Sequence, residues 1–160
     1  MPDPAHQRRR EFLIDFSLVP SSTGLGRLIR LPLRFLPRQM VIPILQGPLR
    51  GAKWIVGSGV HGNWLGSYER DKQWAMWSVL EAGQVVFDIG ANVGFYSLLA
   101  SRKVGSAGLV VAIEPLPENL DYIQRHIGLN RCTNVRVESL AISDRSGNAS
   151  FSVSESRFMG

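Results

Sequence analysis

The feature that most constrains the fold is an alternation of apolar runs and helix-like segments between residues 84 and 143. The runs QVVFD, LVVAIE and NVRVESLAIS are rich in Val and Ile, as the strands of parallel sheets are. FYSLLASRK lies between the first two runs, and residues 117–128 between the last two, with Leu120, Ile123 and Ile127 at helical spacing. This alternation predicts an α/β fold, in which right-handed crossovers wind a parallel sheet with flanking helices.

Two elements are expected before this series. SYERDKQWAMWSVLEAG predicts a helix that Ser67 caps and Gly83 ends. Trp74, Trp77 and Leu80 share one face of it, which indicates core packing. Further upstream, VIPILQGPLRGAKWIVG predicts two short strands around a Gly-Pro turn.

Acidic residues follow two consecutive strands of the predicted sheet. Asp88 ends QVVFD and Glu114 ends LVVAIE. In open parallel sheets, ligands bind beyond the carboxyl ends of the strands. We therefore expect both acids at a ligand site.

The turn after Asp88 does not match the common phosphate-binding motifs. A dinucleotide fingerprint needs G-x-G-x-x-G, but here Gly90 is followed by Ala91, Asn92, Val93 and Gly94. An acid in front of this turn would repel two phosphates. No Gly-Lys-Ser/Thr follows, which also excludes a P-loop.

S-adenosylmethionine fits the same turn better, because it has no phosphate and carries a positive sulfonium and a positive α-ammonium. Asp88 then becomes favourable, either directly or through water. Gly90 allows the backbone to approach the methionyl part closely. Asn92 tolerates a positive φ, so it can replace a glycine there.

The remaining part of this cofactor would lie along the next strand ends. Glu114 can accept both ribose hydroxyls in a bidentate manner. Backbone groups near Leu140 and Ala141, at the end of the third strand, can meet the adenine edge.

Each of these residues has a simpler interpretation when it is taken alone. Asp88 can cap the following turn, and Glu114, which precedes Pro115, can be an ordinary surface acid. Glycines occur in any tight turn. The order of these residues on consecutive strand ends favours the cofactor site.

At this point the sequence resembles the FkbM-type methyltransferases, a class I S-adenosylmethionine-dependent family. DIGANVGFYS, AIEPLPEN and NVRVESLAISDRSG carry the resemblance, which extends upstream to GPLRGAKW and GSYERDKQW and covers residues 46–153. It implies a partial Rossmann-like methyltransferase fold and methyl transfer, usually to a hydroxyl of a sugar, lipid or secondary metabolite. By position, it implies a cofactor loop and a ribose-binding acid, formed by Asp88, Gly90, Ala91, Asn92, Gly94 and Glu114.

The resemblance adds one upstream residue, Glu69, in the Tyr-Glu pair that matches the pre-strand helix of the family. We expect Glu69 to close over the cofactor, although a first-turn acid favoured by the helix dipole is an equal alternative.

The family pattern continues with a fourth strand that ends in an Asp-Val-Glu-Gly type motif beside the first strand. The sequence given stops at SRFMG, so we expect a C-terminally truncated domain that lacks its C-terminal strands. QVVFD would then have an unpaired edge, open to homo-oligomer formation. We also expect weak cofactor affinity and uncertain activity of this chain. No catalytic residue is identified, and His126 is interpreted as a surface or partly packed histidine.

Three segments are expected on these grounds. Residues 1–40 form a basic, loosely ordered segment, 41–66 a short strand and loop extension, and 67–160 the N-terminal half of the methyltransferase domain. Residues 1–53 contain nine Lys or Arg against three Asp or Glu, and the remainder nine against ten. Such a basic start can bind an acidic surface, or simply be solvated.

Composition narrows the remaining classes of protein. With 44% hydrophobic and 19% charged residues, the 160-residue chain is expected to be globular, and no apolar run is long enough to cross a membrane. FLIDFSLVP follows three arginines, but Asp15 and the lack of a small-residue cleavage site argue against a signal peptide. The lone Cys132 fits a reducing, cytoplasmic location, and no metal site is expected.

Two other functions stay open beside the enzyme. A non-catalytic binding or scaffold fragment would dock a partner through the open strand edge or the basic start. Nucleic-acid binding is disfavoured, because the tryptophans lie apart from the arginine-rich start.

Overall fold

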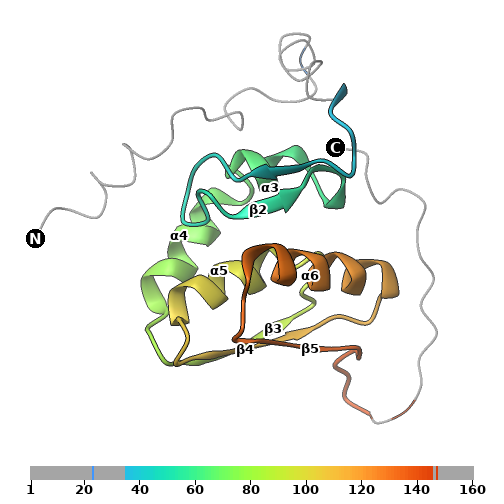
Figure 1. The fold of residues 1–160 in the computed structure, drawn as a ribbon. Helices are drawn as coiled ribbons and strands as arrows, with labels where there is room; N and C mark the ends of the chain where they lie inside the picture. Colours follow the sequence, from blue (N-terminus) through green and yellow to red (C-terminus); the bar gives the residue numbers. More distant parts are fainter. Residues whose placement is uncertain (1–22, 24–34, 146, 148–160) are drawn as a thin grey trace, which may run out of the picture.

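The computed structural model describes residues 23, 35–145 and 147. Most of the basic segment 1–40 and residues 148–160 of the predicted methyltransferase half lie outside the described residues. In the part of the chain that is described, a two-stranded and a three-stranded sheet are joined by helices (Figure 1).

The larger sheet is parallel, as the sequence predicts. It contains β3 (Val85–Ile89), β4 (Leu109–Ile113) and β5 (Val135–Glu138) in the order β3-β4-β5. The register pairs Asp88 with Ala112 and Ile113 with Glu138, so the carboxyl ends of the three strands lie at one edge.

Two helices cover one face of this sheet. They are α5 (Phe95–Val104) and α6 (Pro117–Asn130), and Figure 1 shows both on the same side of the strands. Ala100 and Val104 of α5 pack with Val110, and Ile123 of α6 packs with Ala112. This arrangement is that of a Rossmann-like fold, which confirms the predicted class of fold.

The N-terminal elements lie on the far side of these helices from the sheet (Figure 1). The predicted strand pair is confirmed, since β1 (Val41–Pro43) and β2 (Lys53–Ile55) are antiparallel. The one-turn η3 (Val56–Ser58) and α3 (His61–Leu65) follow. Their side chains share one core with α5, and this core includes Ile44, Leu49, Trp54, Ile55, Trp64, Phe95, Leu98 and Leu99.

The predicted helix before the sheet forms, but its boundaries were wrong. Helix α4 runs from Arg70 to Val79. Ser67 does not cap it, because the N-cap residue is Glu69, and Ser67 belongs to the turn after α3, where its amide bonds to the carbonyl of Gly62. Gly83 lies four residues past the last helical residue, and its amide bonds to the carbonyl of Val104.

Two of the three α4 residues that were predicted to face the core do so. Trp77 packs against the main core, and Leu80 packs against the cluster formed by α5 and β4. Trp74 is half-buried. These side chains therefore attach α4 to the rest of the fold.

Strand β3 is not buried on both sides, although its apolar run QVVFD is typical of a buried parallel strand. Val85, Phe87 and Ile89 are 58%, 64% and 61% exposed. The two helices cover only the opposite face, and within residues 35–145 β3 pairs with β4 alone. The expected open strand edge is thus present in the described structure.

Two residues after or beside the sheet also differ from expectation. Strand β5 ends at Glu138, so the exposed Ala141 lies three residues beyond it, in an irregular segment. His126, interpreted from the sequence as a surface or partly packed histidine, is completely buried. The reason is that its helix is covered on that side by β2, as described below.

Candidate functional site

A cavity of about 330 Å³ opens at the carboxyl end of β3. One wall is the loop from Asp88 to Tyr96, which leads from β3 into α5. The other wall is formed by Ser58–Asn63 at the end of the N-terminal extension, and Tyr68 and Glu69 close a third side. The sequence predicts a ligand site at this edge of the sheet, and this cavity, which Asp88 lines, lies there.

The loop after β3 is shaped by backbone hydrogen bonds and positive φ angles. The amides of Gly90 and Ala91 both donate to the carbonyl of Ile113, at 2.9 and 3.0 Å. Gly90 has φ +74°, and a Cβ added to it would meet nothing within 4 Å. The space above Gly90 is therefore open to a ligand, which is the role that the sequence predicts for this glycine.

Gly94 is needed for a different reason. It has φ +87°, and an added Cβ would lie 3.2 Å from Cγ1 of Ile123 in α6. Gly94 does not line the cavity. Its small size allows the loop to pack onto α6, so we interpret it as a structural residue of the loop rather than as a ligand contact.

Asn92 adopts the positive φ that the sequence predicts, at +51°. Its amide donates to Oε2 of Glu114 at 2.9 Å. This bond connects the loop to the end of β4 and explains how a non-glycine residue is held in the left-handed region.

Glu114 is only 4% exposed, and the protein already uses both of its carboxylate oxygens. Oε1 accepts hydrogen bonds from the amide of Leu116 at 3.1 Å and from Nδ2 of Asn119 at 3.0 Å. With the bond from Asn92, three of about four acceptor positions of a carboxylate are filled. In this conformation Glu114 organises the cofactor loop, and bidentate binding of two ribose hydroxyls would require it to exchange partners.

Asp88 lines the cavity and is partly buried. Its Oδ2 accepts a hydrogen bond from Oγ of Ser97 at 2.5 Å. Burial raises the pKa of Asp88, the Ser97 bonds counteract this, and the Glu114 carboxylate adds to the rise. No Lys or Arg is among the described residues that line the cavity beside Asp88.

Glu69 faces the same cavity from the start of α4. It is the N-cap residue of this helix and has a left-handed backbone, with φ +42°. Its carboxylate accepts hydrogen bonds from Nζ of Lys72 and from Oη of Tyr96, the latter at 2.9 Å. The Lys72 bond lowers the pKa of Glu69, and the Tyr96 bond lowers it further, while burial opposes both. Glu69 is therefore a fixed, ionised carboxylate at the rim.

Tyr96 and Tyr68 stay protonated next to this carboxylate. Burial and the Glu69 carboxylate raise the pKa of Tyr96. Burial also raises the pKa of Tyr68, with the Glu69 charge as the second cause. Both phenols act as hydrogen-bond donors at neutral pH, and neither is suited to accept a proton.

The wall formed by Ser58–Asn63 is the part of the site that sequence reasoning missed. Asn63 is only 4% exposed, and it lines the cavity. Oδ1 of Asn63 lies so close to Gly59 that an added Cβ there would be 2.6 Å away. These residues precede Asp88 by about thirty positions and form no recognised motif, so no local signal could have found them.

Five of the eight predicted site residues therefore line one cavity, namely Glu69, Asp88, Gly90, Ala91 and Asn92. Gly94 and Glu114 support the loop from behind it. Ala141 is exposed and does not line the cavity.

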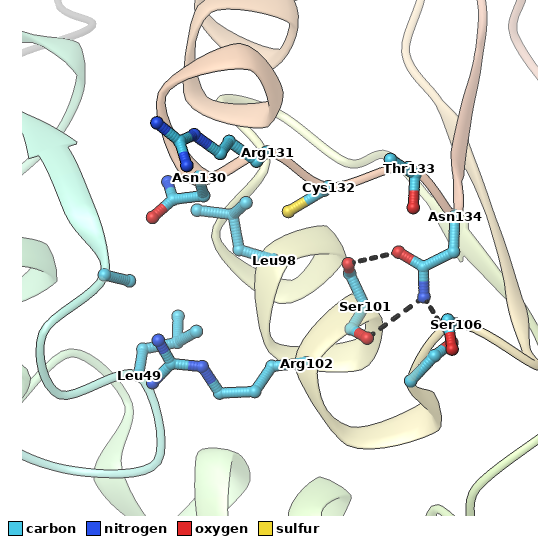
Figure 2. A pocket seen from close by; sticks show the side chains of 12 residues that line it. Leu49, Leu98, Ser101, Arg102, Ser106, Asn130, Arg131, Cys132, Thr133 and Asn134 are labelled. Atoms are coloured by element: carbon cyan, nitrogen blue, oxygen red, sulfur yellow. Dashed lines mark hydrogen bonds between the residues drawn. The ribbon is translucent and has the colours of Figure 1, made fainter.

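A second cavity, of about 300 Å³, lies between the carboxyl-terminal ends of α5 and α6 and the turn before β2 (Figure 2). Several of its polar side chains are engaged within the protein. The side chain of Asn134 bonds to the hydroxyl and carbonyl of Ser101 and to the carbonyl of Gly105. Arg102 donates to the carbonyls of Pro48 and Arg50. We assign no ligand to this cavity.

Other kinds of site were also sought among the described residues. No cluster of three or more His, Cys, Asp or Glu side chains is arranged there to hold a metal ion. None of the helices in this part of the chain is both long and apolar enough to span a membrane.

A parallel sheet with helices on one face and a glycine-containing loop after an acidic strand end is a Rossmann-like arrangement. Residues 88–159 match the family model of the methyltransferase FkbM domain. The resemblance expected from the sequence is thus confirmed for this segment, while residues 46–87 lie outside the match.

Solved structures of methyltransferases are similar to part of the chain. One is an S-adenosylmethionine-dependent methyltransferase from Aquifex aeolicus, with 30% identity and a TM-score of 0.39, covering 46% of this chain and 38% of that one. Another is a precorrin-6y C5,15-methyltransferase from Geobacter metallireducens, with 26% identity and a TM-score of 0.39, covering 42% and 36%.

A third structure is TYW2 from P. horikoshii in complex with MeSAdo, with 17% identity and a TM-score of 0.48, covering 82% of this chain and 52% of that one. The chain therefore spans less than two thirds of the length of these proteins. No curated protein shows a significant match to the chain.

Proposed function

We propose that this chain provides the cofactor-binding part of an S-adenosylmethionine-dependent methyltransferase. The observation that carries the proposal is the cavity above Gly90, into which Asp88 projects without a described Lys or Arg in the lining. A partly buried acid in such a place favours a positively charged ligand, because a nearby cation stabilises the carboxylate. The FkbM domain match over residues 88–159 supports the same cofactor.

The residues of the cavity fit the methionyl end of this cofactor. Asp88 and Glu69 face the cavity from different walls and would attract its two positive groups. The open space above Gly90 would admit the methionyl chain close to the backbone. Asn63 offers a side-chain amide with both a donor and an acceptor on the opposite wall.

The ribose and adenine would extend toward the ends of β4 and β5. We propose that Glu114 holds the loop through Asn92 and that its role toward the ribose depends on releasing one of its present partners. The adenine contact near Ala141 stays a proposal of the sequence analysis, because Ala141 lies outside the cavity.

When bound, the cofactor would supply an activated methyl group. The chain's own residues would bind and orient it, and proximity and alignment account for most of the acceleration in such transfers. No histidine is among the described residues that line the cavity, and the lowered pKa of Glu69 makes it a poor proton acceptor. Binding and positioning of the cofactor are therefore the roles proposed for these residues.

The acceptor is proposed from the family resemblance. It would be a hydroxyl oxygen of a sugar, a lipid or a secondary metabolite. Nucleic acid is not proposed, because the described cavity lining carries no Lys or Arg to meet phosphates.

The proposal is tested by a matched pair of glycine variants. Gly90→Ala adds a methyl group to the cavity, whereas Gly83→Ala adds one where nothing lies within 4 Å, outside the cavity. Both residues have similar φ, +74° and +82°, so both substitutions cost about 1 kcal/mol of backbone strain. Isothermal titration with S-adenosylhomocysteine should show weaker binding only for Gly90→Ala. Equal affinity of the two variants would contradict the proposed site.

A second candidate function is a non-catalytic scaffold that self-associates through β3. The exposed Val85, Phe87 and Ile89 favour it, together with a strand edge that no other described strand occupies. Two copies could pair these edges antiparallel in a symmetric dimer. Size-exclusion chromatography should then show a dimer that Phe87→Glu converts to a monomer. A wild-type monomer would remove this candidate.

A further inference from the structure

Helix α6 is joined to strand β2 by side chains that bond to the edge of the strand. Oδ1 of Asn130 accepts a hydrogen bond from the amide of Lys53 at 2.8 Å, and its Nδ2 donates to the carbonyl of Lys53 at 2.9 Å. One helical turn earlier, Nε2 of His126 accepts a hydrogen bond from the amide of Ile55 at 3.2 Å. The two side chains take the place of a neighbouring strand.

The spacing of the two residues makes this possible. Positions i and i+4 of a helix lie about 6 Å apart along its axis. Positions i and i+2 of a strand lie about 6.7 Å apart and present their backbone groups to the same edge. His126 therefore lies opposite Ile55, and Asn130 lies opposite Lys53.

The other nitrogen of His126 reaches the cofactor loop. Nδ1 lies 2.8 Å from the carbonyl oxygen of Val93, which can only accept a hydrogen bond. Nδ1 therefore carries the proton, and the unprotonated Nε2 is free to accept from Ile55. The ring stacks on Trp54, with 3.9 Å between the centroids. A neutral histidine thus bridges the loop on one side and β2 on the other.

These contacts lie directly behind the two walls of the cavity. Val93 belongs to the loop wall, and Ile55 is followed within three residues by Ser58, where the second wall begins. The hydroxyl of Ser58 bonds to the carbonyl of Ile55 at 2.8 Å. A shift of β2 relative to α6 would therefore change the distance between the walls.

Apart from these side-chain bonds and core packing, strand β2 is held by its pairing with β1. The ladder itself is three residues long, and backbone hydrogen bonds from Ile44 to Ala52 and from Val56 to Met40 extend it at its two ends. An isolated two-stranded hairpin is at best marginally stable in water. Core packing fixes Trp54 and Ile55, but packing alone tolerates small slips that directional hydrogen bonds do not.

We propose that His126 and Asn130 are positioning residues that hold Ser58–Asn63 at the correct distance from the Asp88–Asn92 loop. The inference rests on the proposed function in so far as the cavity binds S-adenosylmethionine. The link between the walls is a property of the protein alone, so it can be tested without the cofactor.

The test compares Asn130→Ala with Asn134→Ala. Each substitution removes three side-chain hydrogen bonds from a half-buried asparagine. Asn134 joins α5 to the residue before β5, as Figure 2 shows, and it does not line the cavity beside Asp88, so it controls for a general loss of stability. His126→Phe serves as a second variant, since it keeps a ring against Trp54 but removes both bonds.

The first measurement is hydrogen exchange of the amides of residues 53–63 under native conditions. Asn130→Ala and His126→Phe should accelerate exchange there at least about tenfold relative to the control, as a loss of about 1.4 kcal/mol of local protection implies. Equal exchange in Asn130→Ala and Asn134→Ala would overturn the proposal.

The second measurement is the affinity for S-adenosylhomocysteine, corrected for the folded fraction. Asn130→Ala should weaken binding at least about threefold, and Asn134→Ala should leave it unchanged, since one lost hydrogen bond contributes about 1 kcal/mol. Equal weakening in both variants would show a merely structural role and overturn the proposal. If the wild-type chain does not bind this probe, the proposed function fails, and the exchange experiment still decides whether the two residues position the wall.

Discussion

The buried His126 leads to a prediction about stability and pH. Its pKa is lowered from 6.5 to about 4, mainly by burial, with a smaller contribution from the nearby positive charge of Arg125, while the bond to the carbonyl of Val93 opposes the shift. The unfolded chain therefore binds a proton more readily than the folded protein. This histidine contributes stability fully above about pH 6.5, and the contribution is lost progressively as the pH falls toward about 4.

The size of the effect follows from these two pKa values. Integration of the linkage relation between about pH 7.5 and about pH 5 gives a loss of about 2 kcal/mol in the free energy of unfolding. Other groups titrate in the same range, so the wild-type protein must be compared with a variant that lacks this proton. His126→Phe keeps an aromatic ring against Trp54 and cannot titrate.

Urea unfolding at the two pH values measures the difference directly. At about pH 7.5, His126→Phe should be less stable than the wild type by about 2 kcal/mol or more, because the amide of Ile55 and the carbonyl of Val93 lose their partner. Between the two pH values, the wild type should lose about 2 kcal/mol more than the variant does. Equal losses would refute the assignment of His126 as a neutral bridge.

Three further predictions concern the cofactor loop and its rim. Gly94→Ala should destabilise the protein by about 1–3 kcal/mol in urea unfolding, because its Cβ would press on Ile123 at a positive φ; an unchanged midpoint would contradict this. Asn92→Gly should preserve or raise stability, whereas Asn92→Val should lower it by about 1–2 kcal/mol, since a β-branched residue disfavours φ +51°; equal stability of the two would contradict the strain. Tyr96→Phe removes the hydroxyl bonded to Glu69, so the pKa of Glu69 measured by NMR should rise, and an unchanged value would show that this bond is not formed.

The regular part of the fold could be predicted because its signals are local. The apolar runs at β3, β4 and β5 and the helical spacing in α6 specify their own secondary structure. The positive φ at Asn92 followed from the side chain's tolerance of that region. The alternation then predicted a parallel sheet with flanking helices.

What could not be predicted depends on contacts between distant segments. Phe87 lies in a run that is typical of a buried strand, yet it is 64% exposed because no described element covers its face. His126 lies in an amphipathic helix, and only its contact with Ile55 of β2 reveals its role. Asn63 lines the cavity because β2 packs against α6, and no local sequence pattern predicts this packing.

The N-terminal boundary of helix α4 also depends on contacts that the local sequence does not reveal. Ser67 is a good cap by residue type, but the turn after α3 uses its amide, and the helix begins after Glu69 in a left-handed conformation. This backbone brings the Glu69 carboxylate to Tyr96. A residue that resembled an ordinary first-turn acid thus lies at the cavity rim because of tertiary contacts.

The central claim is that the cavity beside Asp88 takes a positively charged cofactor without phosphate. Isothermal titration of the chain with S-adenosylmethionine and, separately, with NAD tests it most directly. We predict saturable one-to-one binding of S-adenosylmethionine that Asp88→Asn weakens, and no measurable heat with NAD. Binding of NAD, or S-adenosylmethionine binding that is unaffected by Asp88→Asn, would contradict the account.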